Sequence, residues 1–147
     1  MGVEIGFCIK LKQVKDVFSI ENEVTERARK RGYDIRFLND KPEYYVSNVL
    51  DHLRWYENAI FLKHQDWHEE LSFDIDYRSK TENLKNIELI TLRPTYRSLA
   101  YEIIFHEYDI HKFLDDLKYI FQAEKVGFSV EGGFSNCGEV DESLEYW

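Results

Sequence analysis

The sequence predicts an α+β domain: a mainly antiparallel sheet with a meander over about residues 71–108, packed by two to three helices. Leu71–Tyr77 alternates apolar and polar residues, which indicates a half-buried strand. Ile87–Leu92 and Leu99–Tyr108 follow it, both rich in aromatic or β-branched residues, and complete the predicted meander. Apolar residues then recur at helical spacing over Ile110–Phe121, which predicts a helix that packs on the sheet.

The N-terminal third predicts further elements of both kinds. Val3–Leu11 has the alternation of a strand. Helical spacing follows from Val14, so we expect a helix that begins at Val14 or only near Ser19 and ends near Gly32, a suitable C-terminal cap. Tyr33–Leu38 predicts a short strand. We expect a helix to begin at Pro42 and to continue to Tyr56, and we favour a strand over a helical extension for residues 58–63.

The middle strand of the meander is predicted to be central in the sheet. Its apolar residues occupy both faces, Ile87 and Leu89 on one and Ile90 and Leu92 on the other. Asp109 is placed to cap the following helix, Gly127 to end it, and residues 128–130 to add a last short strand.

The composition is that of one folded domain over residues 1–131, followed by an acidic, aromatic tail over residues 132–147. Of 147 residues, 44% are hydrophobic and 32% are charged, which excludes wholesale disorder. The tail contains no Lys or Arg and ends in Tyr146 and Trp147.

The charge and the apolar pattern exclude several classes of partner. The formal net charge of −9 opposes binding to nucleic acid and anionic lipid and favours a basic protein partner. No apolar run is long enough for a membrane span, and no leader is visible, so the cytosol is expected. Cys8 and Cys137 do not suggest a disulfide framework, and Cys8 reads as a buried small hydrophobe. No cofactor is predicted.

Candidate catalytic residues are few. His64 and His68 could share one zinc ion if they lay one helical turn apart, but Gln65 stands where a zinc hydrolase of the HExxH type has its glutamate. His106 and His111 could form an acid–base pair with neighbouring glutamates. Acidic neighbours disfavour Cys137 as a nucleophile. Surface or core histidines remain the simpler interpretation, and no motif names a reaction.

The residues of greater interest are carboxylates at outward positions of the predicted strands, interleaved with aromatic side chains. Trp and Tyr are common anchors of protein interfaces. The alternative to partner binding is a structural role for each residue: the acids keep one face of the sheet solvated, and the aromatic side chains fill the core. The predicted partner-binding residues are Asp74, Asp76, Glu88, Glu102, Trp67 and Tyr96, with Tyr44, Tyr45 and Trp55 as further candidate anchors.

In size, acidity and apparent architecture the chain resembles bacterial toxin immunity proteins. That resemblance implies a small protein that neutralises a cognate basic toxin, often a nuclease, by stoichiometric complex formation. Carboxylates would then stand in for the phosphates that a basic cleft expects, and aromatic side chains would seal the interface. Two other functions stay open: a small metal-dependent hydrolase or nucleotide-processing enzyme using His64 and His68, and a subunit that docks through its C-terminal tail.

Overall fold

The computed structural model describes residues 5–46, 54–79 and 86–130, and in these ranges it is an α+β fold. The strands are β1 (Ile5–Lys15), β2 (Tyr33–Phe37), β3 (Glu43–Val46), β4 (Arg54–His64), β5 (Leu71–Arg78), β6 (Ile87–Pro94) and β7 (Ala123–Val130). The helices are α1 (Val17–Lys30), α2 (Arg97–Tyr101), the π-helix η1 (Glu102–Glu107) and α3 (Ile110–Phe121). The predicted fold class is confirmed.

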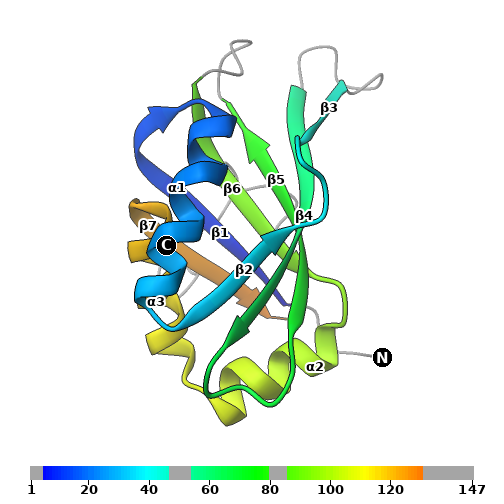
Figure 1. Ribbon diagram of the computed structural model, residues 1–147, viewed down its shortest axis with the longest axis vertical. Helices are drawn as coiled ribbons and strands as arrows, with labels where there is room; N and C mark the ends of the chain where they lie inside the picture. The colour runs from blue at the N-terminus through cyan, green and yellow to red at the C-terminus, as the bar shows by residue number, and fades with distance from the viewer. Residues whose placement is uncertain (1–4, 47–53, 80–85, 131–147) are drawn as a thin grey trace.

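The strands form one seven-stranded sheet in the order β2-β4-β5-β6-β1-β7, with β3 paired to β4 beside β2. Every described pairing is antiparallel, and β4, β5 and β6 follow one another as a meander. In Figure 1, α1 lies in front of the strands and α2 lies at the lower end of the sheet. We call the side covered by α1 and α3 the helix face and the opposite side the outer face.

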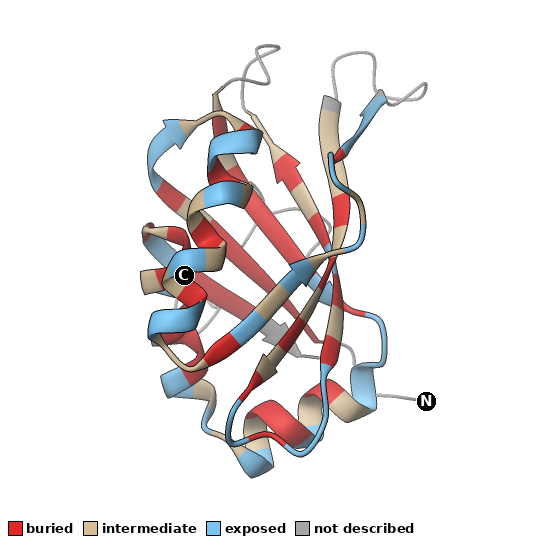
Figure 2. Ribbon diagram, in the orientation of Figure 1, coloured by how far each residue is buried: buried red, intermediate tan, exposed pale blue. Residues whose placement is uncertain are grey.

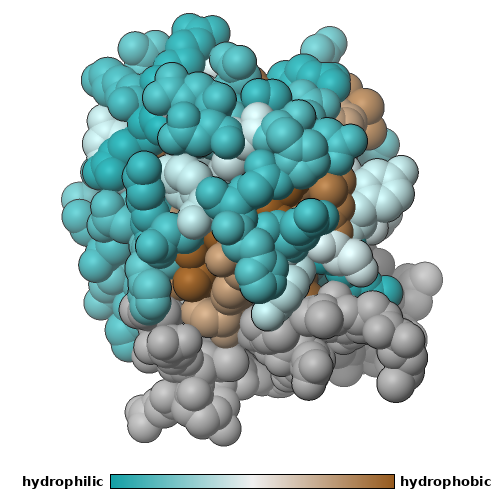
Figure 3. Space-filling model, turned by 90° about the horizontal axis from the view of Figure 1, so that it is seen from below, coloured by the Kyte–Doolittle hydropathy of each residue, from teal (hydrophilic) through white to brown (hydrophobic). Residues whose placement is uncertain are grey.

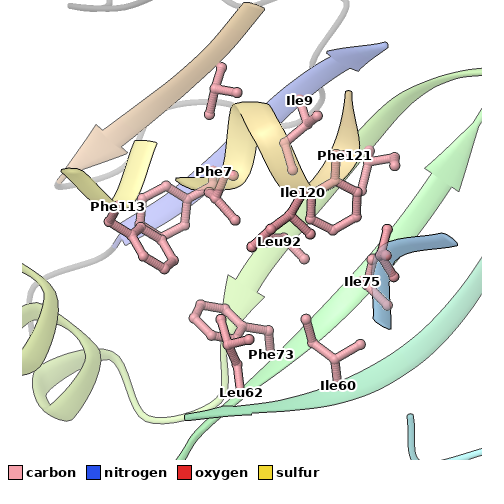
Figure 4. Packing of buried hydrophobic residues seen from close by; sticks show 14 of the residues in the cluster. Phe7, Ile9, Ile60, Leu62, Phe73, Ile75, Leu92, Phe113, Ile120 and Phe121 are labelled. Atoms are coloured by element: carbon pink, nitrogen blue, oxygen red, sulfur yellow. The ribbon is translucent and has the colours of Figure 1, made fainter. Parts of the chain in front are cut away.

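The core lies on the helix face. Phe7 of β1 contacts Phe113 of α3 and Phe73 of β5, with ring centroids 5.1 and 6.4 Å apart, and all three side chains are fully buried. Figure 4 shows these rings together with aliphatic residues of neighbouring strands, and Figure 2 shows buried residues along the central strands. Burial of such aromatic and branched side chains is the main source of folding free energy.

Helix α3 begins after Asp109, the cap that the sequence predicted, whereas α1 begins at Val17, between the two predicted starts, because β1 continues to Lys15. The Asp109 carboxylate accepts hydrogen bonds from the backbone N–H groups of His111 and Lys112 and so caps α3. Asp16 caps α1 in the same way. Gly32 follows α1 with φ +84°, a left-handed conformation that favours glycine.

The segment Leu99–Tyr108, predicted as the third strand of the meander, is helical instead. Ala100, Ile103 and Ile104 are its buried residues, and they recur every three to four positions, which is helical spacing. The Tyr108 N–H donates to the carbonyl of Ile103, five residues earlier, as in a π-helix. Its β-branched and aromatic residues favoured a strand, and tertiary burial overrode that preference.

The helix predicted from Pro42 to Tyr56 is also wrong in its described parts. Residues 43–46 form β3, and residues 54–56 begin β4, with Tyr44 opposite Tyr56 and Tyr45 opposite Trp55. The apolar stripe that indicated a helix falls mainly on residues 47–53, which lie outside the described residues. The strand favoured for residues 58–63 is confirmed as part of β4.

The predictions for the end of the domain are partly confirmed. Strand β6 lies between β5 and β1, and its residues Ile87, Leu89, Ile90 and Leu92 are all buried, as expected for a central strand. Helix α3 ends at Phe121 rather than at Gly127, because Gln122 adopts a left-handed cap, and the last strand is correspondingly longer. The predicted tail lies outside the described residues.

Cys8 departs in part from its prediction. It is fully buried in β1, as the strand pattern predicted, but it is disulfide-bonded rather than a free thiol. Cys137 lies outside the described residues.

Candidate functional site

Two cross-strand rows of side chains lie on the outer face where β3, β4 and β5 run together. One row is acidic, because the register sets Glu43 opposite Glu57 and Glu57 opposite Asp76. The other row is aromatic and cationic, because Tyr45 stands opposite Trp55, which in turn stands opposite Arg78. Side chains directly opposite each other in antiparallel strands are in contact range, so each row is a continuous set of neighbours.

Within each strand the acidic residue contacts the member of the other row two positions away. The Tyr45 hydroxyl donates to Glu43 Oε2 at 2.6 Å, and Trp55 Nε1 donates to Glu57 Oε1 at 2.6 Å. The Tyr45 and Trp55 rings are stacked, with centroids 5.8 Å apart and planes 15° apart. These contacts hold two aromatic rings against two carboxylates in fixed positions.

Asp76 is the partly buried end of the acidic row. Its carboxylate lies 3.9 Å from the Arg78 guanidinium, which itself lies 6.0 Å from the centre of the Trp55 ring. Burial, reinforced by the charge of Glu57, raises the pKa of Asp76 from 3.8 to about 6 despite nearby arginines. The shift therefore records mainly the cost of burying this carboxylate, with a smaller contribution from the charge of Glu57.

We define the acidic aromatic surface as these two rows without Arg78, extended by the exposed carboxylate of Asp74, which lies on the same face of β5. Its members are Glu43, Tyr45, Trp55, Glu57, Asp74 and Asp76. Figure 3 views the other end of the molecule, from below, where much of the described surface is hydrophilic. At the acidic aromatic surface, the Tyr45 ring is 37% exposed.

The structure brings together only part of the predicted partner-binding set. Asp74 and Asp76 share the outer face of β5, but Glu88 alternates with Leu89 on β6 and points to the opposite side of the sheet. Glu102 lies in η1 rather than on a strand, at the helical end of the domain.

Only some of the predicted aromatic anchors lie at the acidic aromatic surface. Trp67 is a core residue, 3% exposed and in contact with the Tyr33 ring. Tyr96 is 68% exposed in the turn after β6, but it lies on neither row. Tyr45 and Trp55 do belong to the site. Glu43 was missed because its segment was predicted to be helical, and Glu57 because it lies between that predicted helix and the strand favoured for residues 58–63. In the observed strands, each acid lies two positions from an aromatic residue on the same face.

His64 and His68, the candidate zinc ligands of the alternative function, lie in different surroundings. His64 is buried at the end of β4, where its Nδ1 accepts from the Asp66 N–H and its Nε2 lies 3.1 Å from the Arg31 carbonyl. Both ring nitrogens are thus engaged within the protein. His68 is exposed and pairs with Glu107 instead. In the part of the chain that the structure describes, no group of three or more potential ligands could hold a metal ion.

A second polar cluster, on the helix face, is buried and serves the fold. The Asp116 carboxylate, 3% exposed, accepts hydrogen bonds from the hydroxyls of Tyr33 at 2.6 Å and Tyr108 at 2.7 Å. Arg31 adds a contact of 3.3 Å to the same carboxylate. Burial and the hydrogen bond to Asp116 raise the pKa of Tyr33 far above its usual value, so its hydroxyl stays a donor.

Asp76→Asn is expected to stabilise the protein at pH 7 by about 1–2 kcal/mol. A carboxyl with a raised pKa binds its proton more tightly in the folded state, so its contribution to stability falls as pH rises from about 4 to about 6. Asparagine keeps the shape and removes the charge.

Urea unfolding of the wild type and the variant at pH 4 and pH 7 measures this effect. The gain should be largely absent at pH 4. Asp74→Asn, an exposed neighbour on the same strand, is the control and should change stability little at either pH. Equal behaviour of the two variants at pH 7 would contradict the assignment.

Among the helices in the described ranges, none combines the length and apolar character needed to cross a membrane. Comparisons with protein-family models, with curated proteins and with solved structures give no match for this chain.

Proposed function

We propose that this chain is a stoichiometric binding protein that neutralises a basic protein partner, most simply a cognate toxin such as a nuclease. The observation that carries the proposal is the acidic aromatic surface. Its carboxylates offer a row of negative charge, and its two stacked rings offer apolar area that stays partly exposed. Interfaces combine these properties: charge steers association, and buried Tyr and Trp side chains supply much of the affinity.

The geometry favours binding over catalysis at this surface. The carboxylates of Glu43 and Glu57 accept hydrogen bonds from their own neighbours Tyr45 and Trp55, so they are held in place before a partner arrives. A row held in this way loses less conformational freedom on binding than mobile side chains would. Arg and Lys side chains of a partner can approach both the carboxylates and the faces of the rings.

The raised pKa of Asp76 fits the same role. A carboxylate kept partly buried beside Glu57 is unfavourable for the isolated protein, and a cation from a partner would relieve that repulsion. Functional sites typically contain residues that lower the folding stability of the unbound protein and that acquire an opposite charge from the partner in the complex. The cytosolic location expected from the sequence stays a prediction, and the disulfide at Cys8 argues against it, since such bonds are rare in the cytosol.

The test is co-expression with the protein encoded beside this chain's gene and purification, followed by titration calorimetry for the stoichiometry and stopped-flow measurement of the association rate at several salt concentrations. We expect a one-to-one complex whose association slows at least about tenfold between low and high salt, because exposed charges are screened. A complex insensitive to salt, or a basic neighbour that does not bind at low salt, would contradict the proposal.

A further inference from the structure

Strand β7 is an edge of the sheet. It stands last in the strand order, and among the described strands only β1 pairs with it. The outward side of an edge strand presents backbone N–H and C=O groups with which a further strand can pair. Figure 1 shows α3 and β7 on one side of the molecule and β3 on the other, so this edge lies away from the acidic aromatic surface.

A cavity of about 390 Å³ lies along this edge, between β7 and α3. Its α3 side is one helical stripe with a spacing of three or four residues, formed by His111, Leu114, Asp115 and Lys118. Its β7 side is formed by Glu124, Lys125 and Val126. Leu114 and Val126 are each 5% exposed and supply the apolar part of the cavity, whereas the other lining residues are exposed.

The two carboxylates of the cavity are already engaged by cations that do not line it. Asp115 contacts Arg31 at 3.2 Å, and Glu124 contacts Lys10 at 3.5 Å. The negative charge of the cavity is therefore largely compensated from outside.

The two lysines of the cavity are not compensated in this way. Within the ranges that the structure describes, neither Lys118 nor Lys125 has a carboxylate in ion-pair contact. The register also sets Lys125 directly opposite Lys10, a pairing of like charges. The cavity therefore presents uncompensated positive charge on its helix side and on its strand side.

We propose that an extended acidic segment of another protein binds in this cavity by adding a strand to β7. Its backbone pairs with the open edge, its apolar side chains pack on Leu114 and Val126, and its carboxylates pair with Lys118 and Lys125. In strand addition, main-chain hydrogen bonds supply affinity, and the side chains at alternate positions supply specificity.

A second copy of this chain fits the same edge less well. Pairing of two β7 strands would bring like charges to one edge, because each copy carries Lys125 there, and lysine on an edge strand is a device against such pairing. The inference does not depend on the proposed function, since the acidic aromatic surface lies toward the opposite edge of the sheet.

The first test measures binding of a fluorescein-labelled peptide, Glu-Glu-Val-Glu-Val-Glu-Glu, to the full chain by fluorescence anisotropy. We expect the double variant Lys118→Glu, Lys125→Glu to bind at least about tenfold more weakly, because like charges then replace both cations. The double variant Lys30→Glu, Lys41→Glu is the control, since it makes the same charge change at exposed positions that do not line the cavity.

The control variant should bind nearly as well as the wild type, and circular dichroism verifies that both variants are folded. Equal losses in the two variants would show that the peptide responds to net charge alone and would overturn the proposal. Absence of binding to the wild type at millimolar concentration would overturn it as well.

The second test asks whether the peptide pairs as a strand. Two further peptides of the same sequence carry N-methyl groups on alternate backbone nitrogens, starting at the first residue in one and at the second in the other. Only every second N–H of an added strand points to its neighbour, so one methylated peptide should bind at least about tenfold more weakly and the other should not. Equal binding of all three peptides, or a dimer of the free chain that the peptide does not dissociate, would overturn strand addition by a partner.

Discussion

Asp116→Ala is expected to destabilise the domain by about 2–4 kcal/mol, because the Tyr33 and Tyr108 hydroxyls lose their buried acceptor, at about 1–3 kcal/mol for a fully buried group. The substitution removes the acceptor of the Tyr33 and Tyr108 hydroxyls and one partner of Arg31. Tyr33 is 2% exposed, so its hydroxyl would have no access to water. A buried donor without an acceptor carries the full cost of its desolvation.

Asp115→Ala is the matched control for this prediction. Asp115 precedes Asp116 on α3 and contacts the same Arg31 guanidinium at 3.2 Å, but its side chain is 68% exposed. An exposed ion pair contributes little, so we expect a loss below about 1 kcal/mol. Urea denaturation followed by circular dichroism measures both variants. A loss at Asp116 as small as that at Asp115 would show that the buried network does not stabilise the fold.

The contrast between the two aspartates shows what a sequence can reveal about such a network. The helical stripe of α3 could be predicted, because Phe113, Leu117 and Ile120 recur at the spacing of one buried face. Asp116 lies within that face, but its neighbours in the chain do not reveal the two tyrosines that bond it. Tyr33 and Asp116 are 83 residues apart, and only the packing of β2 against α3 brings them together.

The same dependence on contacts between distant parts of the chain explains which parts of the candidate site were predicted. Strict alternation over Leu71–Tyr77 was sufficient to place Asp74 and Asp76 on one face of a strand. Glu43 and Glu57 needed the pairing of β3 with β4, which depends on a register that local pattern does not set. The short β3 and the start of β4 flank residues whose apolar spacing favoured a helix. The helix predicted there concealed the strand pairing, so two of the site's carboxylates were not recognised.

Glu57→Lys is expected to weaken binding of a basic partner by about 2–5 kcal/mol, the range for a charged group at the centre of an interface. Glu57 joins both rows of the acidic aromatic surface, since it stands opposite Glu43 and Asp76 and accepts a hydrogen bond from Trp55. Lysine at this position would repel a partner's cations and release the Trp55 indole from its acceptor. The domain should still fold, because burial is the main cause of the raised pKa of Asp76, and a cation in place of Glu57 removes the smaller, repulsive contribution.

Glu26→Lys makes the same change in net charge at an exposed position of α1, away from the outer face. Affinity for the co-purified partner, measured by calorimetry at fixed salt, should fall strongly for Glu57→Lys and only slightly for Glu26→Lys. Long-range attraction depends on total charge, which the two variants share, whereas contact at the site depends on position. Equal losses would mean that the partner responds to net charge alone, and an unchanged affinity for Glu57→Lys would place the interface on another part of the molecule.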